Sequence, residues 1–284
     1  MQIGINCKTL KSAISFSQLI ETVSSASFAG LEFKMQDVID YSSIESLDRV
    51  KDLFLFHNII PISFVDGLYY GLLGPSREHT ESVIKWKKYC KIANFLGCNL
   101  ATLVINPRTD MAANKAYILS KSRLKELADI AREYNIEIAI EALGIKKNIP
   151  TRLNGSNQFI DKVSQASELV SSVDSKNVGI VLDIFHWYVS GGDLKELQDL
   201  RPGMIKLMHI NDAPAGSPYE LKDSQRVLPG EGVINLASVF ENIGSSQYSG
   251  FLSVEIFNQN IWEMEQLKAA NRVYQSVKNI LPYI

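Results

Sequence analysis

The chain has 284 residues, a formal net charge of −2 and a sequence pI near 6.1. This near-neutral balance gives no overall attraction to nucleic-acid phosphates or to anionic lipid, so we expect neither a nucleic-acid nor a membrane partner. Hydrophobic residues make up 46% of the chain and charged residues 21%, which excludes a disordered protein and supplies a substantial core.

The N-terminal residues 1–8 carry no basic segment followed by an apolar one, and no apolar run is long enough to span a membrane. We therefore expect a cytoplasmic protein. The three cysteines, Cys7, Cys90 and Cys98, are an odd number without metal-ligand spacing. We expect reduced thiols in the core rather than a disulfide framework.

Short apolar runs rich in Ile, Val and Leu alternate with amphipathic segments along the chain. Eight of these runs are predicted to be strands: residues 2–7, 30–33, 60–65, 100–105, 136–141, 178–183, 205–210 and 251–256. The segments between them have apolar residues at helical spacing. Gly30, Gly97 and the pair Tyr134-Asn135 are expected to close helices.

Strict alternation of strands and helices predicts a parallel sheet covered by helices, and eight repeats predict a closed barrel. We therefore expect one α/β domain over residues 1–284, a (β/α)8 TIM barrel. An open dinucleotide-binding sheet is disfavoured because the first strand-to-helix turn, residues 5–10, has no GxGxxG sequence. The longest loop-like segment, residues 213–232, follows the seventh predicted strand, where a barrel places an active-site loop.

A residue with a metal-ligating side chain stands at or near the end of each of the last four predicted strands: Glu141, Asp183, His209 and Glu255. Side chains alternate along a strand, so the residues two positions earlier share their inward direction. These inward neighbours are uncharged: Ala139, Val181, Leu207 and Ser253. The residues between are apolar and are expected to face the helices: Ile140, Leu182, Met208 and Val254. This pattern aims four ligating groups at one mouth of the barrel.

Three carboxylates and one imidazole form a hard to intermediate ligand set, which suits one divalent ion such as Mn²⁺, Mg²⁺, Co²⁺ or Zn²⁺. Without a cation, three carboxylates in one partly buried pocket would be costly or would take up protons. We therefore predict one divalent metal ion as the cofactor. The alternative is that each residue caps a helix or pairs with a lysine, as ordinary residues at strand ends do.

Two further residues are predicted to bind substrate near this mouth. His186 lies just beyond the sixth predicted strand, and Arg226 lies on the long loop after the seventh. The planar fork of Arg226 suits a hydroxyl, carboxylate or phosphate group, and Lys34 is a second candidate to bind an anion. The alternatives are a core histidine and a surface ion pair. Four aromatic residues are candidates for an apolar pocket wall, or for ordinary core: Phe185, Trp187, Phe257 and Trp262.

The residues around these positions resemble the xylose-isomerase-like barrel superfamily, in particular its sugar phosphate isomerase/epimerase branch. Residues 178–186 (VGIVLDIFH) resemble its sixth-strand motif, and residues 205–214 (IKLMHINDAP) resemble its metal-histidine segment. Residues 226–232 (RVLPGEG) resemble its arginine loop, and residues 250–257 (GFLSVEIF) resemble its last, glutamate-bearing strand. The resemblance implies that the four residues at the strand ends are metal ligands and that His186 and Arg226 contact the substrate.

Members of this superfamily include ketose 3-epimerases, hydroxypyruvate isomerases, inosose and 3-dehydroshikimate dehydratases, and zinc-dependent apurinic endonucleases. The ketose 3-epimerases carry another substrate-binding glutamate shortly after the fifth-strand ligand, and residues 143–148 offer none. The endonucleases bind three zinc ions through extra histidines after strands two to four. This chain has Lys34-Met35, Asp66-Gly67 and Asn106-Pro107 at those places, so we exclude the endonuclease branch.

The resemblance implies a metal-dependent isomerase or epimerase of a small sugar or keto-polyol. The metal would bind a carbonyl and a neighbouring hydroxyl oxygen, and Glu141 and Glu255 would act as base and acid through a cis-enediolate. A dehydratase of the inosose or 3-dehydroshikimate type is the alternative, because the same enolate can expel a β-hydroxyl group. A second alternative is a barrel that binds a sugar or a metal without catalysis. The sequence is also compatible with a homo-oligomer.

Overall fold

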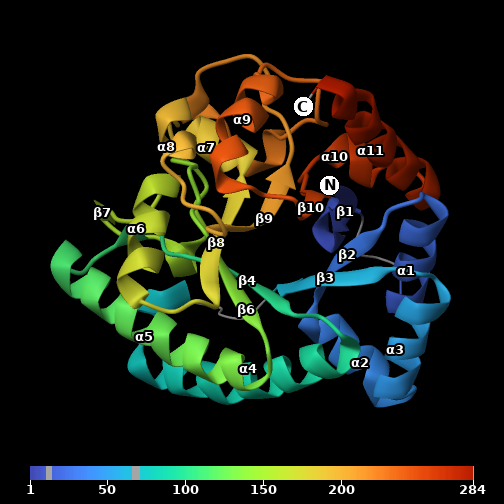
Figure 1. Cartoon of the computed structure of the whole chain (residues 1–284), viewed down its shortest axis with the longest axis horizontal. Helices are drawn as coiled ribbons and strands as arrows, with labels where there is room; N and C mark the ends of the chain where they lie inside the picture. The colour runs from blue at the N-terminus through green and yellow to red at the C-terminus, as the bar shows by residue number, and fades with distance from the viewer. Residues whose placement is uncertain (11–14, 66–70, 284) are drawn as a thin grey trace.

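Eight parallel strands form a closed barrel in the order β1-β10-β9-β8-β6-β4-β3-β2, and helices surround it (Figure 1). The structure is a computed structural model that describes residues 1–10, 15–65 and 71–283. Parallel pairing of β1 with β10 closes the ring, so the first strand lies beside the last. The predicted TIM-barrel fold is confirmed.

The barrel strands are β1 (Gln2–Asn6), β2 (Gly30–Lys34), β3 (Ile60–Val65), β4 (Leu100–Val104), β6 (Glu137–Glu141), β8 (Val178–Asp183), β9 (Ile205–Ile210) and β10 (Phe251–Val254). Each lies within two residues, at either end, of the run predicted for it. Two short strands that were not predicted, β5 (Arg108–Thr109) and β7 (Asn157–Gln158), pair antiparallel. They join the loop after β4 to the loop after β6.

The helices are α1 (Phe16–Ser25), α2 (Met35–Ile44), α3 (Leu47–Phe56), α4 (Ser76–Leu96), α5 (Ala113–Glu133), α6 (Val163–Val173), α7 (Ile184–Val189), α8 (Leu194–Gln198), α9 (Leu236–Asn242), α10 (Gln259–Trp262) and α11 (Gln266–Ile280). Gly97 closes α4 in the left-handed conformation with φ of 79°, as predicted. The prediction for Gly30 was wrong, because it begins β2 and closes no helix. A side chain there would meet the Ile60 carbonyl oxygen at 2.9 Å, so close strand packing explains this glycine.

Apolar side chains pack into two separate cores. The barrel interior is filled by Ile62, Leu100, Ala139, Val181 and Leu207. The alternate residues belong to the larger core between strands and helices: Ile140, Leu182, Met208 and Val254. The predicted alternation of inward and outward side chains is therefore confirmed.

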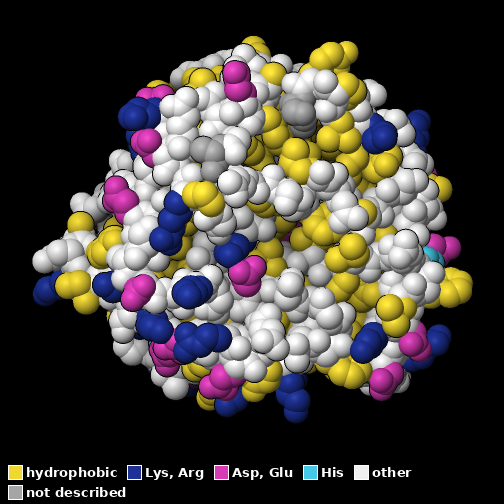
Figure 2. All heavy atoms as spheres, viewed as in Figure 1, with side chains coloured by type: hydrophobic (Ala, Val, Ile, Leu, Met, Phe, Trp, Pro, Cys, Tyr) yellow, Lys and Arg dark blue, Asp and Glu magenta, His cyan; other side chains and the backbone are white. Residues whose placement is uncertain are grey.

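The three cysteines are buried and form no disulfide. Burial raises the pKa of each thiol to about 12, so all three are protonated at neutral pH. None of the described helices combines the length and the apolar character that a membrane span requires. Charged side chains of both signs are interspersed over the face in Figure 2, and hydrophobic ones gather toward α10 and α11.

Candidate metal centre

Four side chains from neighbouring barrel strands meet at one end of the barrel. Glu141 and Asp183 end β6 and β8, His209 lies in β9, and Glu255 directly follows β10. All are buried, and one ligand atom from each lies within 4.8 Å of the other three. Metal ions such as zinc hold such atoms at about 2.0–2.2 Å, so atoms on opposite sides of an ion are roughly 4.4 Å apart. The donor set and its spacing therefore fit one divalent ion.

His209 presents its two ring nitrogens to different groups. Nδ1 lies 3.3 Å from Glu141 Oε1, 3.2 Å from Glu255 Oε2 and 3.5 Å from the nearest Asp183 oxygen. Nε2 lies 3.1 Å from Glu32 Oε1 inside the barrel. Burial alone would lower the pKa of His209, but the carboxylates of Glu32 and Glu255 raise it well above the usual value. Because Nδ1 faces the other three candidate ligands and Nε2 faces Glu32, Nδ1 is the nitrogen that is placed to ligate a metal.

Glu32, in β2, is a site residue that sequence reasoning missed. It is fully buried, and its carboxylate accepts hydrogen bonds from Ser63 Oγ at 2.7 Å and from Ser253 Oγ at 2.5 Å. The inward positions considered in the sequence were uncharged, whereas the interior holds this carboxylate because the two hydroxyls and His209 offset its desolvation. A signal was available: Glu32 is the one acidic residue within the second predicted strand.

Asp183 is fixed by donors on both of its oxygens. Oδ1 caps α7 by accepting the backbone N–H of His186 at 2.8 Å. Oδ2 accepts hydrogen bonds from Arg226 Nη1 at 2.7 Å and from Asn211 Nδ2 at 3.1 Å. Burial would raise the pKa of Asp183, but Arg226, His186 and His209 together outweigh burial and hold the pKa well below its usual range. Asp183 is therefore ionised and rigidly oriented.

Arg226 is fully buried at the centre of this network, so it is no surface ion pair. Nη1 also lies 3.1 Å from Glu255 Oε2, and Nη2 contacts Asp223 Oδ1 at 2.7 Å and His186 Nε2 at 2.9 Å. Burial would lower the pKa of Arg226, but its carboxylate partners, Asp183 first, raise it. The rings of Phe185 and Phe257 flank the guanidinium, with centroids 5.2 and 4.9 Å from Cζ. These contacts hold two of the candidate ligands in place.

Asp212 anchors the loop that carries Arg226. Its carboxylate accepts backbone N–H groups of Gly230 at 3.1 Å, Gly232 at 3.0 Å and Ile234 at 3.0 Å. The backbones of Asp212 and Val227 also exchange hydrogen bonds, both of 3.0 Å. The long loop predicted at residues 213–232 therefore folds back on the end of β9, and Arg226 is buried beside the candidate ligands Asp183 and Glu255.

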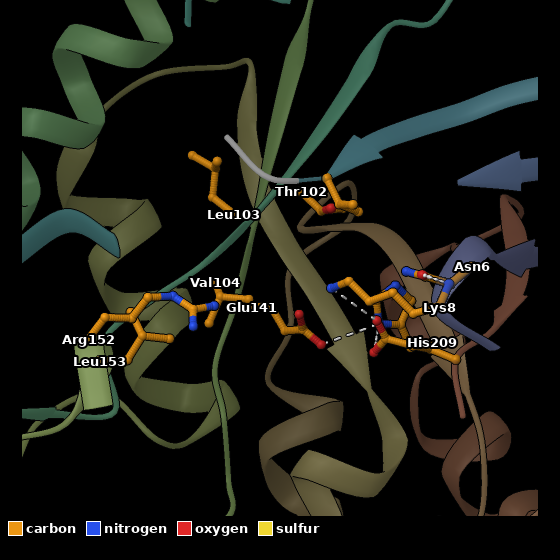
Figure 3. Close-up of a pocket in the computed structure, with 11 residues that line it drawn as sticks. Asn6, Lys8, Thr102, Leu103, Val104, Glu141, Arg152, Leu153 and His209 are labelled. Carbon is orange, nitrogen blue, oxygen red and sulfur yellow. Dashed lines mark hydrogen bonds and ion pairs between the residues drawn. The ribbon is translucent and has the colours of Figure 1, made fainter. Parts of the chain in front are cut away.

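A pocket opens beside the candidate metal centre (Figure 3). Glu141, His209 and Glu255 line it, together with the apolar side chains of Val65, Leu103, Val104 and Leu153. Among the described residues its lining includes neither Asp183, His186 nor Arg226; Arg226 contacts the other two. It also includes none of the four predicted wall aromatics; Phe257 and Trp262 line a neighbouring pocket together with Lys34.

Known proteins are similar to this chain along most of its length. Inosose isomerase from Halalkalibacterium halodurans is 26% identical over 243 residues, which cover 84% of this chain and 82% of that one. A 3-dehydroshikimate dehydratase from Pseudomonas aeruginosa is 28% identical over 247 residues, 84% of this chain but 36% of that longer protein.

The structure described as IolI protein with a binding zinc atom covers 100% of this chain and 99% of its own, with a TM-score of 0.88 and 24% identity. At this identity the likeness shows the shared barrel fold. Residues 20–278 match the family model described as xylose isomerase-like TIM barrel. This match spans most of the chain, which therefore belongs to the xylose isomerase-like TIM barrel family.

Proposed function

We propose that this protein is a divalent-metal-dependent isomerase or epimerase of a small sugar or keto-polyol. The observation that carries the proposal is the gathering of three buried carboxylates and one imidazole within 4.8 Å, beside a pocket at the barrel mouth. Glu141, Asp183, Glu255 and Nδ1 of His209 would hold the ion. Zinc is the ion named for the IolI structure, so it is the first ion to test among Zn²⁺, Mn²⁺, Mg²⁺ and Co²⁺.

A bound divalent ion supplies Lewis acidity, which makes the C–H bond beside a substrate carbonyl more acidic. Glu141 and Glu255 both line the pocket, and their nearest oxygens lie 3.3 and 3.2 Å from the same His209 nitrogen. They approach the centre from different strands. One carboxylate removes the proton, and the other returns a proton to the neighbouring carbon or to the opposite face.

The surrounding residues have positioning roles in this proposal. Arg226 orients Asp183 and Glu255, and Glu32 fixes His209 by accepting a hydrogen bond from Nε2–H. His186 remains a candidate for substrate contact, because its Nδ1 is buried without a hydrogen-bond partner among the described residues. Arg226 remains a candidate as well, through its place beside Glu255.

A dehydratase is the second candidate, favoured by the similarity to 3-dehydroshikimate dehydratase over 84% of this chain. The proposed function does not include a three-zinc endonuclease. Lys34-Met35 and Asn106-Pro107 carry no imidazole, and the third position, Asp66-Gly67, lies outside the described residues.

Hydrogen exchange in D2O tests the proposal. The zinc- or manganese-loaded protein is incubated with inososes, free ketoses and 3-dehydroshikimate, and the products are analysed by NMR and mass spectrometry. We expect deuterium on the carbon beside the carbonyl, together with an isomer or epimer. A new absorbing enone or aromatic product would indicate the dehydratase instead. Binding without any carbon-bound exchange would contradict both and favour a non-catalytic barrel.

A further inference from the structure

The pocket is also rich in hydrogen-bond donors and in positive charge that the proposed proton transfer does not use. Besides the candidate metal ligands and the apolar residues, the pocket is lined by Asn6, Lys8, Thr102 and Arg152. Among the described lining residues, the only carboxylates are those of Glu141 and Glu255. The space between these donors therefore suits a ligand group that only accepts hydrogen bonds.

Asn6 directs two N–H donors into this pocket. Its Oδ1 accepts the backbone N–H of Lys8 at 3.0 Å, and this bond fixes which end of the amide is oxygen. Nδ2 then points toward the pocket (Figure 3). Asn6 is 0% exposed, and Nδ2 has no hydrogen-bond partner in the described part of the chain. Because an unsatisfied buried donor is unfavourable, an acceptor on a bound ligand is its natural partner.

Lys8 and Arg152 reach the pocket from opposite sides (Figure 3). Lys8 follows β1 and Arg152 lies in the loop after β6, and these strands stand opposite each other in the barrel order. Lys8 Nζ is 3.9 Å from Glu255 Oε1, so it lies close to the proposed reacting atoms. A group held between the two cations would therefore sit beside the candidate metal centre.

The fold fixes the place of Arg152. It lies in a short 3-10 turn, Thr151–Leu153, whose last residue is buried. The antiparallel pair β5/β7 joins this loop to the loop after β4 a few residues further on. The guanidinium therefore projects from a folded segment of the mouth rather than from a loose tail.

We propose that the substrate is an anionic keto-polyol, whose carboxylate or phosphate group is bound by Arg152, Lys8 and the amide of Asn6. This inference rests on the proposed function. Carboxylates and phosphates carry acceptor oxygens that match the fork of an arginine and the point charge of a lysine. Leu103, Val104 and Leu153 add an apolar lining, and charge-assisted bonds are stronger beside apolar side chains than in open water.

Binding of unreactive anions tests the site without turnover. The probes are gluconate and ribitol 5-phosphate, which have no ketone or aldehyde group, with neutral xylitol as the uncharged comparison, measured by calorimetry on the zinc-loaded protein. We expect one of the anions to bind at least ten-fold more tightly than xylitol, and Arg152→Gln to weaken its binding by about 10- to 100-fold. Lys147→Gln removes an exposed charge from the same loop, paired with Glu220, and should leave binding unchanged. The anion that binds more tightly shows whether the site prefers a carboxylate or a phosphate group.

Turnover separates this inference from the proposed function. For an anionic substrate, Arg152→Gln should raise KM at least ten-fold with kcat within about two-fold, and added salt should raise KM of the wild-type protein. Equal binding of the anions by wild-type and Arg152→Gln proteins would overturn the anionic site. So would equal efficiency with neutral and anionic keto-polyols, although the isomerase proposal would then stand. Tight, Arg152-dependent anion binding without any exchange would instead keep the site and contradict the proposed chemistry.

Discussion

The mouth and the interior of the barrel are built from the same strands and differ in chemistry. In β6, β8 and β9 an apolar interior residue stands two positions before a candidate ligand: Ala139 before Glu141, Val181 before Asp183, and Leu207 before His209. Because side chains alternate with a period of two, each pair shares one face of its strand. One strand therefore supplies both packing and chemistry. We therefore expect substitutions in the barrel interior to change mainly stability, and substitutions at the mouth to change mainly activity.

The largest effect is expected at the mouth. Glu141→Gln and Glu255→Gln each remove a proposed base or acid, so kcat for hydrogen exchange should fall by about 10²- to 10⁴-fold. The shape of the side chain is kept, and the melting temperature should stay within a few degrees of the wild-type value. Exchange rates and thermal unfolding are measured with metal content as the control. Near-normal exchange in either variant would contradict the paired-carboxylate mechanism.

The interior should respond in the opposite way. Leu207→Ala leaves a cavity between the apolar residues inside the barrel, so the free energy of unfolding should fall by about 2–5 kcal/mol. Leu267→Ala, at a residue that is 38% exposed, is the matched control and should change it by less than about 0.5 kcal/mol. Denaturant unfolding measures both. A large loss of kcat in folded Leu207→Ala protein, with the free energy of unfolding unchanged, would contradict this separation of roles.

Glu32 belongs to both regions, because it lies inside the barrel and contacts His209. Glu32→Gln should weaken zinc binding by about 10- to 100-fold, because the His209 ring loses its hydrogen bond from Nε2–H to a carboxylate. Competition with a chelator gives the affinity, and ¹⁵N NMR of His209 reports its tautomer. Glu137→Gln, where the carboxylate pairs with Lys206 at the other end of β6, is the matched control. Unchanged affinity and tautomer in Glu32→Gln would remove Glu32 from the site.

The smallest effect is expected at the cysteines. Their pKa values of about 12 and their burial predict very slow alkylation at pH 8 in the folded protein, and full reaction after unfolding. All three belong to the core between strands and helices, and Cys7 also lines the neighbouring pocket that Lys34 lines. Mass spectrometry after timed alkylation distinguishes them. Fast reaction at Cys7 alone would mean that the mouth opens more than the described packing allows.

The fold and the gathering of the four candidate ligands were predictable because they depend on local periodicity. Strand alternation places Glu141 and Asp183 at strand ends whatever the loops do. The place of Arg226 was not predictable, because it requires the backbone N–H groups of Gly230 and Gly232 to meet Asp212, a tertiary contact. Glu32 was missed for the same reason: its partners lie on β3, β9 and β10, and only the closed barrel brings them together.

Anomalous diffraction from crystals soaked in Zn²⁺ tests the metal centre most directly. We expect one strong peak about 2.0–2.2 Å from Nδ1 of His209 and from carboxylate oxygens of Glu141, Asp183 and Glu255. A peak at other residues would contradict the proposed centre. Well-ordered crystals in which these four side chains surround no peak at saturating zinc would contradict it as well.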